Sequence, residues 1–201
     1  MRILHLSDTH NQHRDLTDLP KADLIIHSGD FSFAGTEAEF RDFLNWFSNL
    51  NYQYKIFIGG NHDSFLEENS AENIRKMLPE NCHYLSHNGV KIGNLNFWGV
   101  PMFVSENIDG TYFDKIKQIP TKTDVLISHH PPLGILDLDG ETNFGCAELL
   151  HQTLKIQPKF HLFGHIHNAY GVEKSKHTIF ANSVVLNGNY KLSNSPFLFE
   201  V

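Results

Sequence analysis

The chain has 201 residues, of which 40% are hydrophobic and 19% charged, and its formal net charge is −7. This length suits one domain, residues 1–201, with enough apolar side chains to form a hydrophobic core that needs no disulfide bonds or structural metal. The acidic balance argues against an extended nucleic-acid-binding face, and no apolar run is long enough to cross a membrane. With only two cysteines and no disulfide or zinc pattern, a cytoplasmic protein is expected.

Short apolar runs along the chain predict strands that are buried on both faces. The predicted strands cover residues 2–7, 23–28, 54–58, 83–85, 94–99, 124–128, 159–163, 178–182 and 196–200. An apolar stripe containing Phe40, Phe43 and Phe47 predicts a helix over residues 36–50, and Thr36 with Glu39 forms a capping-box pattern at its start. Further helices are expected over residues 71–78, 111–119 and 147–155. Residues 82–104 read as consecutive strands, so the sequence predicts an α/β fold with mixed parallel and antiparallel sheets.

Residue types that bind metals follow five of these predicted strands. In chain order the motifs are Asp8-Thr9-His10, Gly29-Asp30, Gly60-Asn61-His62-Asp63, His129-His130 and Gly164-His165-Ile166-His167. Taken alone, each Asp or Asn reads as a turn residue, and each His as a surface or core residue. Turn chemistry does not require histidine at three of five strand ends, however. Ligands of open α/β sheets bind beyond the carboxyl ends of strands, and mixed carboxylate, amide and imidazole groups suit Mn²⁺, Fe or Zn²⁺.

In this order, the five motifs resemble those of the calcineurin-like metallophosphoesterase superfamily. The context is most similar to the metallophosphodiesterase (MPPED) branch, through residues 29–32, 54–62, 128–134 and 163–167. The resemblance spans about residues 2–200. It implies a β-sandwich flanked by helices, in a four-layer αββα arrangement.

The resemblance also implies a centre of two divalent ions. Asp8, His10 and His167 would hold the first ion, and Asn61, His129 and His165 the second. Asp30 would bridge both. Mn²⁺ is the first expectation, with Fe, Zn²⁺, Ni²⁺ or Co²⁺ as alternatives.

Two neighbouring residues are expected to be catalytic. His62 stands where the superfamily places a histidine that is not a ligand, and we expect it to stabilise phosphoryl oxygens and protonate the leaving group. Asp63 would orient His62 or support the ligands, with a helix or turn cap as an equally weighted alternative. His130 replaces the glycine of the branch pattern, and either reaches the substrate or faces away. The register with Pro131-Pro132 favours His129 as the ligand of that pair. The remaining histidines are expected to be structural or superficial: His5, His13, His27, His83, His87, His151, His161 and His177.

The expected function is therefore hydrolysis of phosphodiesters, such as cyclic or other small nucleotides, by in-line attack of a hydroxide that bridges two metal ions. One alternative is a phosphomonoesterase or protein phosphatase of the same fold. Another is a catalytically silent binding scaffold, which filled ligand positions and the presence of His62 disfavour. The expected partner is a small phosphodiester or nucleotide, with no membrane and no extended nucleic acid; an oligomer is left open.

Overall fold

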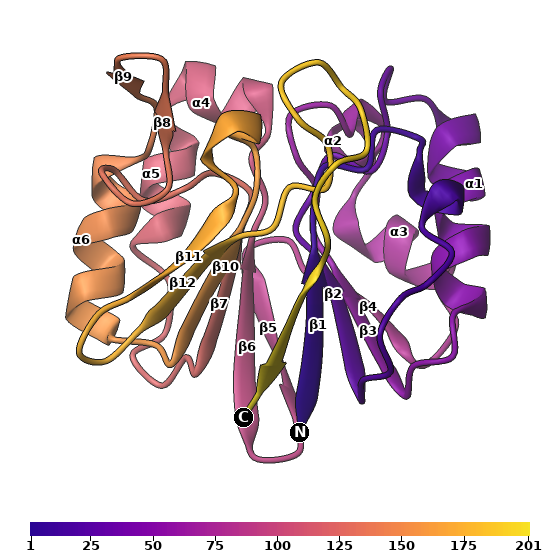
Figure 1. Cartoon of the computed structure of the whole chain (residues 1–201), viewed down its shortest axis with the longest axis horizontal. Helices are drawn as coiled ribbons and strands as arrows, with labels where there is room; N and C mark the ends of the chain where they lie inside the picture. Colours follow the sequence, from indigo (N-terminus) through magenta and orange to yellow (C-terminus); the bar gives the residue numbers. More distant parts are fainter.

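The computed structural model describes residues 1–201, and two β-sheets packed face to face form its centre (Figure 1). Helices α1, α2 and α3 cover the outer face of one sheet, and α4, α5 and α6 cover the outer face of the other. The layers therefore follow the order helices, sheet, sheet, helices. The predicted mixed α/β sandwich is confirmed.

The first sheet has the strand order β13-β1-β2-β3-β4, in which β1 to β4 run parallel and β13 pairs antiparallel with β1. Its strands are β1 (Arg2–Leu6), β2 (Leu24–His27), β3 (Tyr54–Phe57), β4 (Cys82–Tyr84) and β13 (Phe197–Glu200). The helices beside it are α1 (Glu37–Asn49), α2 (Ser64–Glu68) and α3 (Ala71–Lys76). A 3₁₀ turn, η1 (His13–Asp15), follows β1.

The second sheet has the order β11-β12-β10-β7-β6-β5, with a parallel centre and an antiparallel strand at each edge. Its strands are β5 (Asn88–Ile92), β6 (Leu95–Val100), β7 (Val125–Ser128), β10 (Phe160–Phe163), β11 (Gly171–Lys174) and β12 (Ile179–Asn182). Its helices are α4 (Val104–Asp109), α5 (Thr111–Ile116) and α6 (Ala147–Ile156). The connections include a small hairpin, β8 (Leu138–Asp139) with β9 (Thr142–Asn143), and a 3₁₀ turn, η2 (His167–Ala169).

The core divides into layers because successive side chains of a strand point to opposite faces. Ile3 and Ile26 lie between the two sheets, whereas Leu4 and Ile25 face the helices. The predicted helix over 36–50 is α1, and the capping box of Thr36 and Glu39 is formed at its start. Aromatic rings from α1 fill the helix-facing core of the first sheet.

Several elements of the structure were not predicted from the sequence, among them the short strands β8 and β9 and the turns η1 and η2. Strands β5 and β11 were not predicted separately, because both are edge strands with exposed positions that break the apolar signal. Helices α2 and α4 were also missed; α4 buries no side chain and α2 buries only Leu66, so neither shows an apolar stripe. The longest helix, α1, has 13 residues, and none of the helices combines the length and apolar character needed to cross a bilayer.

Three fully buried histidines link elements beneath the carboxyl ends of the strands. His5 on β1 bonds through Nε2 to Ser28 Oγ at 2.8 Å and through Nδ1 to Ser183 Oγ at 2.6 Å, so it joins the two sheets. His161 on β10 bonds to Ser128 Oγ at 2.8 Å and to Thr153 Oγ1 of α6 at 3.1 Å. Burial lowers the pKa of His5, His27 and His161 to about 3 each. These rings are therefore neutral structural links.

Such lowered pKa values predict that the protein loses stability in mild acid. Each of these histidines has a pKa near 6.5 when unfolded, so below that pH the unfolded chain binds protons that the folded protein rejects. The free energy of unfolding should fall by ~1.4 kcal/mol per pH unit for each such ring as the pH drops from 6 to 4. Urea unfolding of the wild type and of His161→Gln over this range measures the unfolding free energy at each pH. In the variant this free energy should change less steeply with pH, by the amount that corresponds to about one bound proton. Equal slopes for the two proteins would contradict it.

Candidate metal centre

Five loops at the carboxyl ends of β1, β2, β3, β7 and β10 carry all the predicted site residues, and they meet at one end of the sandwich. The loops after β1 and β2 are joined along their backbones. Asp8 N donates to Gly29 O at 3.0 Å, His10 N to Asp30 O at 3.1 Å and Asn11 N to Phe31 O at 2.9 Å. The Phe31 ring stacks on Phe43 of α1, with centroids 4.1 Å apart. This contact anchors in the core the loop that carries Asp30.

The backbone of this end of the sandwich is bent into conformations that non-glycine residues rarely adopt. Asp8, His10, Asp30 and His165 all have positive φ angles, of 57°, 37°, 55° and 71°. Left-handed conformations of such residues cost on the order of 1–3 kcal/mol each and cluster at functional sites. Four of the seven predicted ligands therefore lie on strained backbone held in place by its surroundings.

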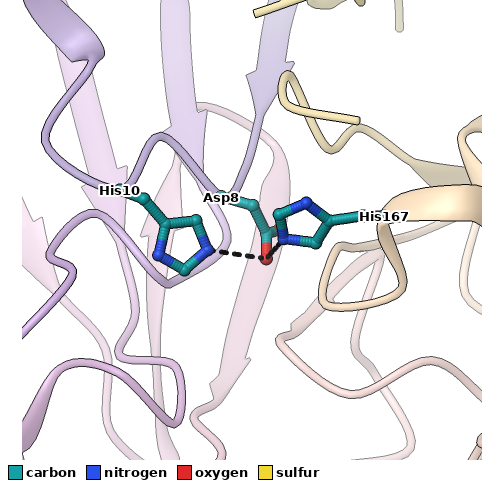
Figure 2. A group of neighbouring side chains, drawn as sticks. All are labelled: Asp8, His10 and His167. Atoms are coloured by element: carbon teal, nitrogen blue, oxygen red, sulfur yellow. Dashed lines mark ion pairs between the residues drawn. The ribbon is translucent and has the colours of Figure 1, made fainter. Parts of the chain in front are cut away.

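Asp8, His10 and His167 form the first group of side chains (Figure 2). Nε2 of His10 lies 3.9 Å from Asp8 Oδ1, and Nε2 of His167 lies 3.5 Å from the same oxygen. Asp8 Oδ1 and His10 Nε2 are buried and have no hydrogen-bond partner. Burial raises the pKa of Asp8, but the adjacent His167 and the imidazoles of His129 and His10 outweigh it and hold that pKa well below its usual range.

Backbone carbonyls set the orientation of three of the predicted histidine ligands. Nδ1 of His10 bonds to Ser32 O at 3.0 Å, Nδ1 of His129 to Ser28 O at 2.9 Å, and Nδ1 of His167 to Asn187 O at 3.1 Å. A carbonyl only accepts, so each Nδ1 carries a proton and each Nε2 is directed into the site, where it can bind a metal ion once it has no proton. Metal-binding histidines typically have such partners.

Asp30, His129 and His165 form the second group. Nε2 of His129 lies 3.4 Å from Asp30 Oδ2 and 3.1 Å from Asn61 Oδ1. These atoms are all electron-pair donors when the ring is neutral, so their approach requires either a proton on Nε2 or a cation between them. Burial lowers the pKa of His129, but the charge and hydrogen bond of Asp30 outweigh it and raise it to about 9. Without an ion the ring therefore holds a proton where a cation would fit.

Asp30 lies between the two groups. Its Oδ2 is 3.4 Å from His129 Nε2 on one side and 3.7 Å from His10 Nε2 on the other. Its Oδ1 accepts a hydrogen bond of 2.8 Å from the backbone N–H of His62. One carboxylate thus faces histidines of both groups.

His62 faces the same space, from the loop after β3. Its ring nitrogen lies within 4.8 Å of ligand atoms of His10 and Asp30, and its ring centroid is 4.7 Å from that of His10. Nδ1 of His62 donates to Phe33 O at 2.8 Å, which leaves Nε2 free. The ring is only partly buried, so it can reach both the site and the solvent.

The Asp63 carboxylate holds the backbone of this region together and does not bond to the His62 ring. It accepts hydrogen bonds from the backbone N–H groups of Asp30, Gly60 and Ser32, at 2.8, 2.8 and 3.0 Å, and from Ser32 Oγ at 2.6 Å. Asp63 occupies the N-cap position of α2, but its side chain makes no cap hydrogen bond. Burial and the charge of Asp30 raise its pKa to about 7 against these donors. Of the sequence expectations, support of the ligands fits this geometry, whereas orientation of the His62 ring and side-chain capping do not.

His130, whose role the sequence left open, faces a neighbouring loop. Its Nε2 donates to Phe144 O at 2.7 Å, and its ring centroid is 5.6 Å from that of His165. His129, by contrast, faces Asp30 and Asn61. The two histidines therefore point to different surroundings, and His129 alone joins the ligand groups.

Sequence reasoning missed the groups that orient the ligands. The carbonyls of Ser32 and Asn187 belong to the backbone, so no residue type could have revealed them. Ser32 could have been suspected, because it follows Asp30 by only two positions. Asn187 lies 20 residues from His167, and nothing in the sequence connects them.

Comparison with known proteins shows which family this chain is similar to. A model of the calcineurin-like phosphoesterase family matches residues 1–169. The chain is 32% identical over 232 residues to human metallophosphoesterase domain-containing protein 1, and the match covers all of this chain and 71% of that protein. It is 31% identical over 239 residues to the UPF0046 protein T07D4.2 of Caenorhabditis elegans, of which it spans 60%.

The fold also resembles a solved structure of an archaeal phosphodiesterase. The TM-score is 0.51 at 16% identity, and the match covers 99% of this chain and 100% of that one. At this identity the likeness concerns the fold alone. The resemblance inferred from the motifs, including that to the MPPED branch, is confirmed by the family match and by the human relative.

The close packing at Gly164 predicts that a single methyl group disturbs the centre. A Cβ at this position would lie 2.1 Å from Ser7 Oγ and 2.2 Å from Asp8 Oδ2. Gly164→Ala should displace the Asp8 carboxylate and weaken Mn²⁺ binding by about 10- to 100-fold, the usual effect of disturbing a ligand's support. Titration calorimetry with Mn²⁺ measures this.

Gly171→Ala is the matched control for this substitution. A Cβ there would meet only the flexible Leu136 Cδ2, at 3.2 Å, so Mn²⁺ affinity should be unchanged. If Gly164→Ala bound Mn²⁺ as tightly as Gly171→Ala does, the Asp8 position would not be part of the metal centre.

Proposed function

The chain belongs to the calcineurin-like phosphoesterase family, and from this premise we propose that it hydrolyses phosphodiesters with a pair of divalent metal ions. The family is one of metal-dependent phosphoester hydrolases. The diester preference, small cyclic or other nucleotides as substrates, and the use of two ions are our proposals. The observation that supports them most is the position of the Asp30 carboxylate between two groups of candidate ligand atoms.

The donor set matches borderline divalent cations. We assign Asp8, His10 and His167 to one ion, Asn61, His129 and His165 to the other, and Asp30 to both. Carboxylate, amide and imidazole ligands suit Mn²⁺, Fe or Zn²⁺, and of these Mn²⁺ is our first choice. Two such ions, when bound, supply Lewis-acid polarisation of phosphoryl oxygens and a water of lowered pKa.

The protein's own groups provide orientation and proton transfer. Asp63 fixes the backbone amides around Asp30 and Gly60, and this keeps the shared carboxylate in place. We assign to His62 the donation of a proton to the leaving oxygen from Nε2. Phe33 O accepts the Nδ1 proton at 2.8 Å, and this contact fixes the orientation of the ring.

A substrate panel tests this function. The Mn²⁺-loaded protein should hydrolyse bis-p-nitrophenyl phosphate and 2′,3′- or 3′,5′-cyclic nucleotides with a higher kcat/KM than p-nitrophenyl phosphate. A chelator should abolish the activity, and Mn²⁺ should restore it. A monoester preference would indicate a phosphomonoesterase instead. Full metal occupancy with no hydrolysis of any substrate would indicate a binding scaffold.

The role of His62 makes a separate prediction. A p-nitrophenolate leaves readily without a proton, whereas a ribose alkoxide does not. His62→Ala should therefore lose about 10²- to 10⁴-fold in kcat on a cyclic nucleotide and much less on bis-p-nitrophenyl phosphate.

Metal content must be measured in the same samples, because lost ions would imitate lost proton transfer. His151→Ala, a substitution on the exposed face of α6, is the control and should retain both activities. Equal losses on the two substrates at full metal content would assign His62 to charge stabilisation alone.

A further inference from the structure

Two large aromatic rings are exposed beside the first group of ligands. Phe33 is 56% exposed and Tyr190 is 43% exposed, and their centroids are 5.9 Å apart in an edge-to-face arrangement. Single exposed apolar residues are common on proteins. Here two of them are adjacent, and both contact site histidines.

The Tyr190 ring contacts two of the metal-ligand candidates. Its centroid lies 5.1 Å from that of His10 and 4.9 Å from that of His167. The Phe33 ring lies 5.9 Å from His62 and 6.1 Å from His10. These two rings, which we call the aromatic wall, therefore lie beside His10, His62 and His167.

The backbone holds both rings in this place. Tyr190 has a φ of 56°, a strained value for a bulky residue. Its N–H donates to Asn187 O at 2.8 Å, and its carbonyl accepts from Gln12 Nε2 at 3.0 Å. The same Asn187 carbonyl orients His167, so one turn both sets a ligand and presents the ring.

Phe33 is fixed in a similar way. Its N–H and that of Ala34 donate to Glu39 Oε1, at 3.3 and 3.1 Å, in the first turn of α1. Its carbonyl accepts the Nδ1 proton of His62. The backbone carbonyl of Phe33 thus orients His62, the turn that orients His167 presents Tyr190, and both aromatic side chains remain partly exposed.

We infer that the aromatic wall binds the planar base of a nucleoside substituent by stacking, while the phosphate occupies the metal centre. This inference rests on the proposed function and extends it to a substrate class. A flat ring is the chemical group that gains most from two exposed aromatic faces, and stacking is worth about five- to hundredfold in binding for one base. Stacking tolerates different bases, so we expect recognition of a base without strong selection among bases.

A pair of substrates that differ only in the base tests this inference. Adenosine 2′,3′-cyclic phosphate and methyl riboside 2′,3′-cyclic phosphate have the same reacting phosphate, and the second has no base. The wild type should show a kcat/KM about tenfold higher for the adenosine compound, mainly through KM. Tyr190→Leu and Phe33→Leu should each remove most of this difference, because each should lower kcat/KM for the adenosine compound far more than kcat/KM for the methyl riboside.

Two further variants separate stacking from general damage. Tyr190→Phe keeps the ring and should behave like the wild type. Phe113→Leu removes an aromatic residue that is 37% exposed on α5 and should change neither substrate. Equal kcat/KM for the two cyclic phosphates in the wild type, or equal losses on both in the leucine variants, would overturn the inference.

A binding measurement keeps this test independent of catalysis. With the Mn²⁺-loaded protein, adenosine 5′-monophosphate should bind about tenfold more tightly than ribose 5-phosphate, and Tyr190→Leu should reduce the ratio. If neither cyclic phosphate is hydrolysed, the proposed function fails, and this ratio still decides on the aromatic wall. Equal affinity for the two monophosphates would overturn the inference while leaving phosphodiester hydrolysis intact.

Discussion

Electron-pair donors crowd together at the end of this sandwich, several of them fully buried, and the rest of the structure depends on how they are kept there. Asp8 and Asp30 are both buried, and the free nitrogens of His10 and His129 approach their oxygens within 4 Å. Buried charges are costly unless they are paired or coordinate a metal. Backbone carbonyls prevent the ring nitrogens from turning away, since they hold each Nδ1 from behind. Only a positive charge, carried by a proton or a metal cation, offsets the repulsion between these electron-pair donors.

The fold and the ligand candidates could be predicted from the sequence because each depends on residue type. Apolar runs such as Leu24–His27 indicate strands buried on both faces, with the polar residues after them at the carboxyl ends. The sequence did not reveal that these strands belong to two sheets, with β1, β2 and β3 in one and β7 and β10 in the other. Asp63 was harder to interpret, because its four donors come from loops whose meeting no spacing reveals. The carbonyls of Ser32 and Asn187 were out of reach, since every residue has one. Short elements such as α2, which buries only Leu66, show no apolar stripe.

Local strain and global packing act together at the centre. Positive φ angles at Asp8, Asp30 and His165 disfavour the loops taken alone. Phe31 offsets part of this cost, because its ring is 1% exposed and stacks on Phe43 directly after Asp30 in the chain. A buried aromatic ring contributes ~2–3 kcal/mol, which is of the same order as the strain of one such residue. The aromatic core under α1 thus supports the chemistry above it.

The His5 link between Ser28 and Ser183 marks the seam where the two sheets meet, and the metal centre lies across that seam. Asp8, Asp30 and Asn61 come from the first sheet, whereas His129, His165 and His167 come from the second. Ions bound by ligands from both sheets would cross-link the two halves of the sandwich. Sliding of one sheet against the other and release of the metal would then be a single event. Metal affinity and the resistance of the two sheets to sliding would then rise and fall together, and bound ions would also stabilise the contact between the sheets.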